Sequence, residues 1–187
     1  MANPNAPTGL KAVKDARSGV DNGGLEMFYH PASDGTALYI GDPVVKNGSA
    51  DAAGIAGVVR AAAAGPITGV VEGFVPDGTT NQNGYGAAST AYYVLVRTDP
   101  TEMFIVQEDG GLAAADIGLN ANLVAGSGNA YTKRSGFKLD AATKAITATL
   151  AVKIMGLAPI PGNDFGAYNK ILVMLNNTTE GTGTAGV

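Results

Sequence analysis

The sequence predicts an all-β, mainly antiparallel protein with little helix, folded as a compact β-barrel or a jelly-roll-like sandwich behind an extended N-terminal arm. Glycine is frequent, with 27 residues among 187 and no collagen-like period, which is typical of a chain with many turns. Short apolar runs alternate with turn signals about every 8–12 residues, the spacing of sandwiches and barrels. Helical periodicity is almost absent. Together these features favour about eight to ten short strands.

The expected strands can be placed from apolar runs and the turns between them. Residues 92–97 and 103–107, with the sequences YYVLVR and MFIVQ, flank an Asp-Pro turn and predict a hairpin. Residues 170–175, KILVML, are continuously apolar and fit a fully buried strand. Further strands are expected at residues 25–30, 37–40, 43–46, 55–62 and 67–74.

The clearest period of two in the chain covers residues 145–155. Ile146, Leu150 and Ile154 would lie on one face, with Thr147 and Lys153 on the other. Such alternation predicts a half-buried antiparallel strand. The Ala-rich residues 112–124 are the best candidate for a helical turn, although they are too few for a stable isolated helix.

Three regions follow from this reading of the chain. Residues 1–24 are expected to form an extended arm, because Pro4 and Pro7 restrict their neighbours to extended conformations. Residues 25–176 form the β domain, with a long polar loop at 75–89. Residues 177–187 are a Gly/Thr-rich C-terminal tail without apolar core residues.

Composition argues against several classes of function. The formal net charge is −4 and the pI is about 4.8, so a nucleic-acid-binding face is not expected. The absence of cysteine removes disulfides, thiolate catalysis and Cys-ligated metals. No apolar run approaches the ~18 residues of a membrane helix. The first residues lack the layout of a signal peptide, which predicts synthesis in a cytoplasm.

The residues that carry chemistry do not form a catalytic pattern. His30 is the one histidine, and it ends a strand before Pro31, where a surface or hydrogen-bonded role is expected. A Ser-His-Asp triad needs an activated serine, and no G-x-S-x-G elbow occurs. The acidic pairs Asp99/Glu102 and Glu108/Asp109 end adjacent hairpin strands and fit turn or solubility roles. We therefore expect no enzyme activity and no cofactor.

The loop at residues 77–83, DGTTNQN, has oxygen-bearing side chains at alternate positions and resembles a calcium loop. It lacks the glycine at position six and the bidentate glutamate at position twelve of an EF-hand. A hydrogen-bonded loop is the expectation, and no metal site is predicted.

A series of short motifs extends over nearly the whole chain. Their order and spacing carry more information than any one of them. They begin with M-A-N-x-N-A-P-x-G-L at residues 1–10 and end with G-T-G-T-A-G-V at 181–187. Between them stand A-L-Y-I-G-D-P-V (37–44), G-S-A-D (48–51), I-T-G-V-V-x-G-F (67–74), A-Y-Y-V-L-V-R-T-D-P (91–100), F-I-V-Q-E-D (104–109), D-I-G-L-N-A (116–121), R-S-G (134–136), N-D-F-G (163–166) and L-V-M-L-N-N (172–177).

In this order of segments the chain resembles head decoration (cement) proteins of tailed bacteriophages. The resemblance implies a structural protein of the virion that sits on the capsid surface and is made in the host bacterial cytoplasm. It implies that the protein bridges major capsid protein subunits and stabilises the shell, usually as a homotrimer. The family supplies no catalytic residues. Nucleic acid and membrane are not implied partners.

Within that resemblance, the N-terminal arm is the expected capsid-binding element. An arm can add a strand to a neighbouring subunit through main-chain hydrogen bonds, and many weak copies bind with avidity. The residues predicted to make these contacts are Pro4, Pro7, Leu10, Lys11 and Arg17. Lys14 adds a third basic residue to this segment.

A different class of function remains open from the sequence. The protein could be a phage tail or fibre component, or an outward-facing module on the virion that binds a host receptor or glycan. The loop at 75–89, with Tyr85 and several asparagines, is the feature that favours such a module. The absence of tryptophan makes a glycan site less favourable.

Overall fold

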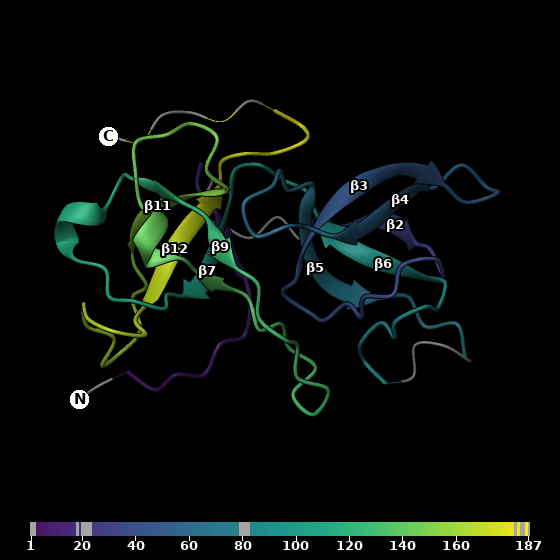
Figure 1. Cartoon of the computed structure of the whole chain (residues 1–187), viewed down its shortest axis with the longest axis horizontal. Helices are drawn as coiled ribbons and strands as arrows, with labels where there is room; N and C mark the ends of the chain where they lie inside the picture. Colours follow the sequence, from purple (N-terminus) through teal and green to yellow (C-terminus); the bar gives the residue numbers. More distant parts are fainter. Residues whose placement is uncertain are drawn as a thin grey trace.

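The computed structural model describes residues 3–17, 19, 24–78, 83–181, 183 and 186. It confirms the predicted all-β class: the sheets are mainly antiparallel and the only helical elements described are two single 3₁₀ turns. Figure 1 shows two bodies side by side, a barrel on the right and a second sheet on the left.

The barrel is closed, with strands in the order β2-β4-β3-β5-β6. Its neighbours pair antiparallel except β2 and β4, which meet in parallel at Tyr29 and Gly57. Closure leaves no free edge in this body. Its core is a compact cluster that includes Phe28, Leu38 and Val94. The strand bounds are β2 Glu26–His30, β3 Pro43–Ala50, β4 Ala56–Arg60, β5 Gly69–Phe74 and β6 Tyr92–Arg97.

The second body is a five-stranded antiparallel sheet in the order β1-β7-β12-β11-β8, beside a two-stranded ribbon of β9 and β10. Its core is the larger one and includes Phe104, Phe137 and Ile171. Ile67 and Val70, from the β5 region of the barrel, belong to the same cluster, so the two bodies share buried apolar surface. The bounds are β1 Lys11–Asp15, β7 Glu102–Gln107, β8 Asn120–Ala121, β9 Leu123–Val124, β10 Lys138–Leu139, β11 Val152–Leu157 and β12 Lys170–Leu175.

Strand β12 lies at the centre of this sheet, between β7 and β11. Its residues pair with β7 from Lys170–Gln107 to Met174–Met103. Four of its six residues are buried, which explains the continuous apolar run KILVML. The prediction of a buried strand at 170–175 is confirmed, as are the strands predicted at 92–97 and 103–107.

The strand predicted at residues 145–155 is wrong over its first half, since β11 begins at Val152. Ile146 is 63% exposed although it was assigned to the buried face. Backbone carbonyls in this stretch are bonded by side-chain amides instead of by a neighbouring strand. The Asn120 amide donates to Thr147 O. The Asn176 amide donates to Ala148 O and Leu150 O. Periodicity could not reveal these partners, which lie 26 to 28 residues away in sequence.

Two other expectations need smaller corrections. The helical turn predicted at 112–124 is only a single 3₁₀ turn, η1 (Ala114–Asp116), followed directly by β8 and β9. A second such turn, η2, covers Ala141–Thr143. Residues 37–40 form isolated bridges at Leu38 and Ile40 rather than a strand.

The described part of the C-terminal tail lies against the folded domain. Thr178 forms a bridge with Ile67, and Thr179 N donates to Ile67 O at 3.1 Å. The hydroxyl oxygens of Thr179 and Thr68 are 2.8 Å apart. These bonds join the tail to the start of the barrel, so its threonines have a structural role that apolar patterning could not indicate.

A buried ion pair lies where the two bodies meet. Asp42 is fully buried at the start of β3, and its Oδ1 lies 3.6 Å from Nε of Arg60, which ends β4. Burial raises the pKa of Asp42, while a hydrogen bond from Ser135 and the charge of Arg60 oppose that rise. The Arg60 guanidinium also lies 4.5 Å from the Phe137 ring centroid and donates to Gly126 O. The pair therefore connects the barrel to residues 126–137.

We predict that Arg60→Ala lowers the free energy of unfolding by about 3 kcal/mol, because it leaves Asp42 buried without its counter-charge. Urea unfolding followed by circular dichroism measures this change. The matched control is Lys46→Ala, which removes an exposed pair with Glu180 and is expected to cost less than about 1 kcal/mol. Equal effects of the two substitutions would contradict a special role for the buried pair.

Candidate functional site

The described part of the N-terminal segment, predicted to be an extended arm, lies along its own chain. The Asn3 amide donates to Asp164 O at 3.1 Å and to Ala167 O at 3.3 Å. Ala6 N donates to Oε1 of Gln107 at 3.0 Å, and Nε2 of Gln107 donates to Pro4 O at 3.2 Å. Gln107, at the end of β7, thus holds the segment in an extended path over the sheet. Residues 3–7 therefore pack against their own chain.

Leu10 is part of the core rather than of a docking surface. Its side chain is 1% exposed and belongs to the larger apolar cluster. Its backbone N–H donates to Gly41 O at 3.0 Å, beside the buried Asp42. The preceding Gly9 fits between Gly41 and Ser135, where a Cβ would lie 2.5 Å from Gly41 O. The Leu10 side chain is therefore held inside the protein, and its contact with a capsid stays a prediction.

Residues after Leu10 form the edge strand β1. Lys11 pairs with Ile105 and Asp15 pairs with Glu102, with a bulge between Ala12 and Lys14. Among the described residues, no strand pairs with the outer edge of β1. Lys11, Val13 and Lys14 are exposed on it. An edge of this kind offers main-chain donors and acceptors to another chain.

The remaining predicted contact residues lie on the surface. Arg17 is exposed just beyond β1, where its N–H donates to Oδ1 of Asp15 at 2.9 Å. Pro4 is exposed and Pro7 is half-buried. Of the five residues predicted to bind a capsid, the structure thus leaves Pro4, Lys11 and Arg17 exposed.

Pro4 borders a small hollow that the sequence did not reveal. The hollow has a volume of about 140 Å³, and its lining includes Ile160, Pro161 and Tyr168 from the loop between β11 and β12. Ile160 and Phe165 in this loop are exposed large apolar side chains. The Pro-Ile-Pro sequence at 159–161 has no local pattern that predicts this position. Only the fold brings it beside the N-terminal segment, 156 residues away from Pro4 to Ile160 in sequence.

Tyr85, the residue of the 75–89 loop that favours a glycan site, packs against neighbouring side chains of its own chain. The Tyr85 ring stacks on Tyr39, with centroids 5.1 Å apart and an interplanar angle of 7°. Lys133 Nζ lies 5.0 Å from the Tyr85 centroid. The ring is half-buried in these contacts and packs within the protein. Residues 79–82, which include part of the calcium-like motif, lie outside the described residues.

His30 is buried, and its ring is positioned by neighbours in the barrel. Nδ1 lies 3.2 Å from Val58 O, which assigns the proton to that nitrogen. The ring stacks on Tyr92 at 4.6 Å, and Nε2 is 3.9 Å from Oδ2 of Asp34. The hydrogen-bonded role expected for His30 agrees with this geometry, while the surface alternative does not.

Of the four carboxylates at the hairpin ends, Glu102 and Glu108 are buried, so the solubility role expected as one of two alternatives does not apply to them. Glu108 Oε2 accepts from the backbone N–H groups of Gly110 and Gly111, while Oε1 accepts from Asn169 N at 3.2 Å. Glu102 is also buried, with Oε2 at 3.8 Å from Nη1 of Arg97. Glu108 orders the turn after β7, while Glu102 pairs with Arg97 inside the protein. Acidic residues near turns carry no sequence signal that separates these structural roles from solvated ones.

Within the described parts of the chain, no group of three or more His, Asp or Glu side chains is placed to hold a metal ion. No helix there is long and apolar enough to cross a membrane. Comparison with known proteins finds no matching family model, curated protein or solved structure. The candidate site is therefore the surface formed by residues 3–17 and the loop at 158–168.

We predict that Leu10→Ala lowers the free energy of unfolding by about 2–5 kcal/mol, the range for a large-to-small change in a packed core. Lys11→Ala and Arg17→Ala should change it by less than about 0.5 kcal/mol, because both side chains are exposed. Denaturant unfolding of the three variants measures the difference. A neutral Leu10→Ala would contradict the assignment of Leu10 to the core.

We also predict that stability falls as the pH drops through about 6.5, the ordinary pKa of histidine. Burial lowers the pKa of His30, with Asp34 and the Val58 carbonyl partly opposing the change. The unfolded chain then binds a proton that the folded state does not, and folding weakens by at most about 1.4 kcal/mol per pH unit.

Since the chain has one histidine, His30→Gln should flatten the dependence of unfolding free energy on pH between 7.5 and 5.5. Chemical unfolding at several pH values in this window provides the measurement. A slope that is the same in the wild type and the variant would show that His30 is not the group responsible.

Proposed function

We propose that this protein is a non-enzymatic head decoration (cement) protein of a tailed bacteriophage, which binds the outside of the capsid and bridges major capsid protein subunits. The resemblance of its ordered motifs to such proteins motivates the proposal. The observation that carries it is the surface strap, residues 3–8 and 11–17, which ends in the edge strand β1; no described strand pairs with the outer edge of β1.

Strand addition is the binding mode that this edge favours. A segment of the shell protein that pairs with the outer edge of β1 would extend the sheet beyond β7 and β12. Lys11 and Lys14 favour an acidic segment, and the bulge between Ala12 and Lys14 limits which registers can pair. Pro4 and Ile160 add exposed apolar surface at the other end of the strap.

Binding by a folded strap differs from binding by a free arm. The hydrogen bonds of Asn3, Ala6 and Gln107 already order the strap, so docking loses less conformational entropy than folding upon binding would. Each contact can still be weak. Several copies joined in a homotrimer, as the resemblance implies, would raise the overall affinity through avidity.

We predict that the double substitution Lys11→Gln/Lys14→Gln weakens capsid binding about tenfold, the factor for two exposed charge contacts of about 0.7 kcal/mol each. The assay mixes purified protein with expanded capsids of the source phage assembled without it, and measures bound protein by co-sedimentation. Cryo-electron microscopy of the same particles locates the bound copies.

Lys144→Gln is the matched control. It neutralises an exposed lysine that follows η2 and pairs with Asp116, outside the strap. It should bind as the wild type does. Wild-type protein that leaves the capsids bare would contradict the proposal and favour a tail or fibre component. Equal binding by all variants would leave the decoration role intact but contradict the part assigned to β1.

A further inference from the structure

Residues 126–136 form a narrow loop that protrudes between the two bodies, at the lower edge of Figure 1. Its two legs touch through their main chains. A Cβ on Gly126 would lie 2.1 Å from Gly136 O, and a Cβ on Gly136 would lie 2.2 Å from Ser127 O. Only glycine permits this approach, so the two glycines set the narrow base of the protrusion.

The end of this loop, defined here as the tip (residues 129–134), is closed by its own hydrogen bonds. Oδ1 of Asn129 accepts from Tyr131 N at 2.8 Å and from Thr132 N at 3.1 Å. Asn129 N donates to Arg134 O at 2.9 Å, and Lys133 N donates to Asn129 O at 2.8 Å. Lys133 has a φ of +61°, a left-handed conformation that these bonds maintain.

Contacts with the barrel fix the direction in which the tip points. Ile40 N donates to Lys133 O at 3.2 Å, and Ser135 N donates to Ile40 O at 2.9 Å. Gly128 packs against the ring of Tyr39, where a Cβ would lie 2.0 Å from a ring carbon. The tip is therefore a preorganised element, and a partner would not have to order it on binding.

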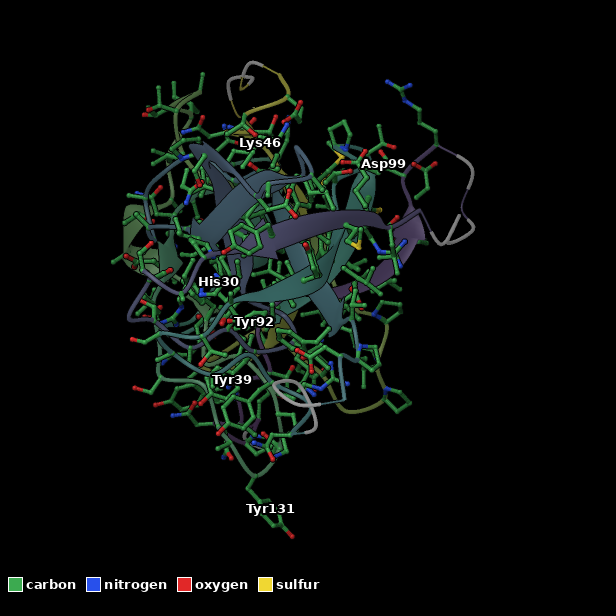
Figure 2. All side chains as sticks on the ribbon, turned by 90° about the vertical axis from the view of Figure 1, so that its right-hand side faces the viewer. His30, Tyr39, Lys46, Tyr92, Asp99 and Tyr131 are labelled. Atoms are coloured by element: carbon green, nitrogen blue, oxygen red, sulfur yellow. The ribbon has the colours of Figure 1, made fainter. Side chains whose placement is uncertain are left out.

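Tyr131 projects from this tip into solvent. Its side chain is 93% exposed, the largest exposed fraction among the exposed large apolar residues, and Figure 2 shows it at the lower end of the molecule. Tyrosine on a rigid loop is a common anchor of protein interfaces, since it supplies a large contact area at low entropic cost. Lys133, whose Nζ lies over the Tyr85 ring, and Arg134 follow it; both are half-buried and make the tip basic in a protein with a formal net charge of −4.

A hollow of complementary charge lies beside the start of β2. It has a volume of about 500 Å³ and is lined by Gly24, Leu25, Glu26, Thr98, Asp99, Pro100 and Glu180. Three of these side chains are carboxylates, of which Glu180 is already paired with Lys46 at 2.6 Å while Glu26 is exposed, and Leu25 is 42% exposed. Apolar surface from Leu25 and Pro100 suits an aromatic ring, while the carboxylates suit an adjacent lysine.

The tip and the hollow cannot meet within one molecule. Figure 2 places Tyr131 at the lower end of the view and Asp99 near the upper end. The two surfaces differ in charge and position, so a contact between two copies through them is head-to-tail rather than symmetric about a two-fold axis. Such a contact closes into a ring if its rotation permits.

We propose that the occupant of this hollow is the tip of a second copy of the chain, with Tyr131 inserted beside Leu25 and Pro100 and Lys133 facing Glu26. The contact goes beyond the proposed capsid binding and uses neither β1 nor the hollow at Pro4. Purified protein suffices to test it.

Sedimentation velocity at protein concentrations from about 1 µM to 1 mM tests this proposal, because that range spans moderate to weak affinities. The wild type should self-associate, and Tyr131→Ala should weaken association at least about 30-fold, as expected for an interface anchor. Since Tyr131 is almost fully exposed, the variant should unfold at the same temperature as the wild type. Ile146→Ala, which truncates another exposed apolar side chain outside both surfaces, is the matched control.

A charge exchange identifies the hollow as the receptor. Lys133→Glu and Glu26→Lys should each weaken self-association, and the double variant should recover it, while Lys144→Gln, outside both surfaces, should have no effect. A monomeric wild type over the whole range would overturn the proposal. So would unchanged association of Tyr131→Ala, or a double variant that does not recover. None of these outcomes depends on capsid binding.

Discussion

The buried pair of Asp42 and Arg60 occupies the point where the barrel, the N-terminal segment and the loop at 126–137 meet. Asp42 accepts a hydrogen bond from Tyr39 N at 2.8 Å and another from the Ser135 side chain, which belongs to that loop. Arg60 donates to Gly126 O and covers the Phe137 ring. A buried carboxylate needs such partners, and here the barrel and the loop at 126–137 supply them together.

The same junction explains why the N-terminal segment is ordered. Gly41, which precedes Asp42, accepts the Leu10 N–H, and this bond holds Leu10 at the apolar core. β1 then follows at the edge of the sheet. The segment that the sequence predicts to be an arm is therefore attached to the core through Leu10. The accessible part of this segment forms a strap whose geometry exists before any partner binds.

The two accessible regions proposed for binding differ in chemistry as well as in place. The strap combines main-chain edge groups with Lys11 and Lys14, which suits an extended acidic segment. The tip presents one aromatic ring on a closed turn, which suits a hollow rather than an edge. A protein with separate surfaces for a shell and for its own copies could bind both at once.

Local sequence determined the all-β class and the strands with uninterrupted apolar runs, such as β6 and β12, because alternation and β-branched residues act over a few neighbours. It also placed Lys11 and Arg17 on the surface. The tertiary structure alone decided that Leu10 is core, that residues 145–151 are not a strand, and that Glu108 is buried. In each case the deciding partner lies far along the chain: Gly41 for Leu10, Asn176 for Ala148 and Asn169 for Glu108. Hydrogen bonds between distant segments leave no period in the sequence, so only the folded chain shows them.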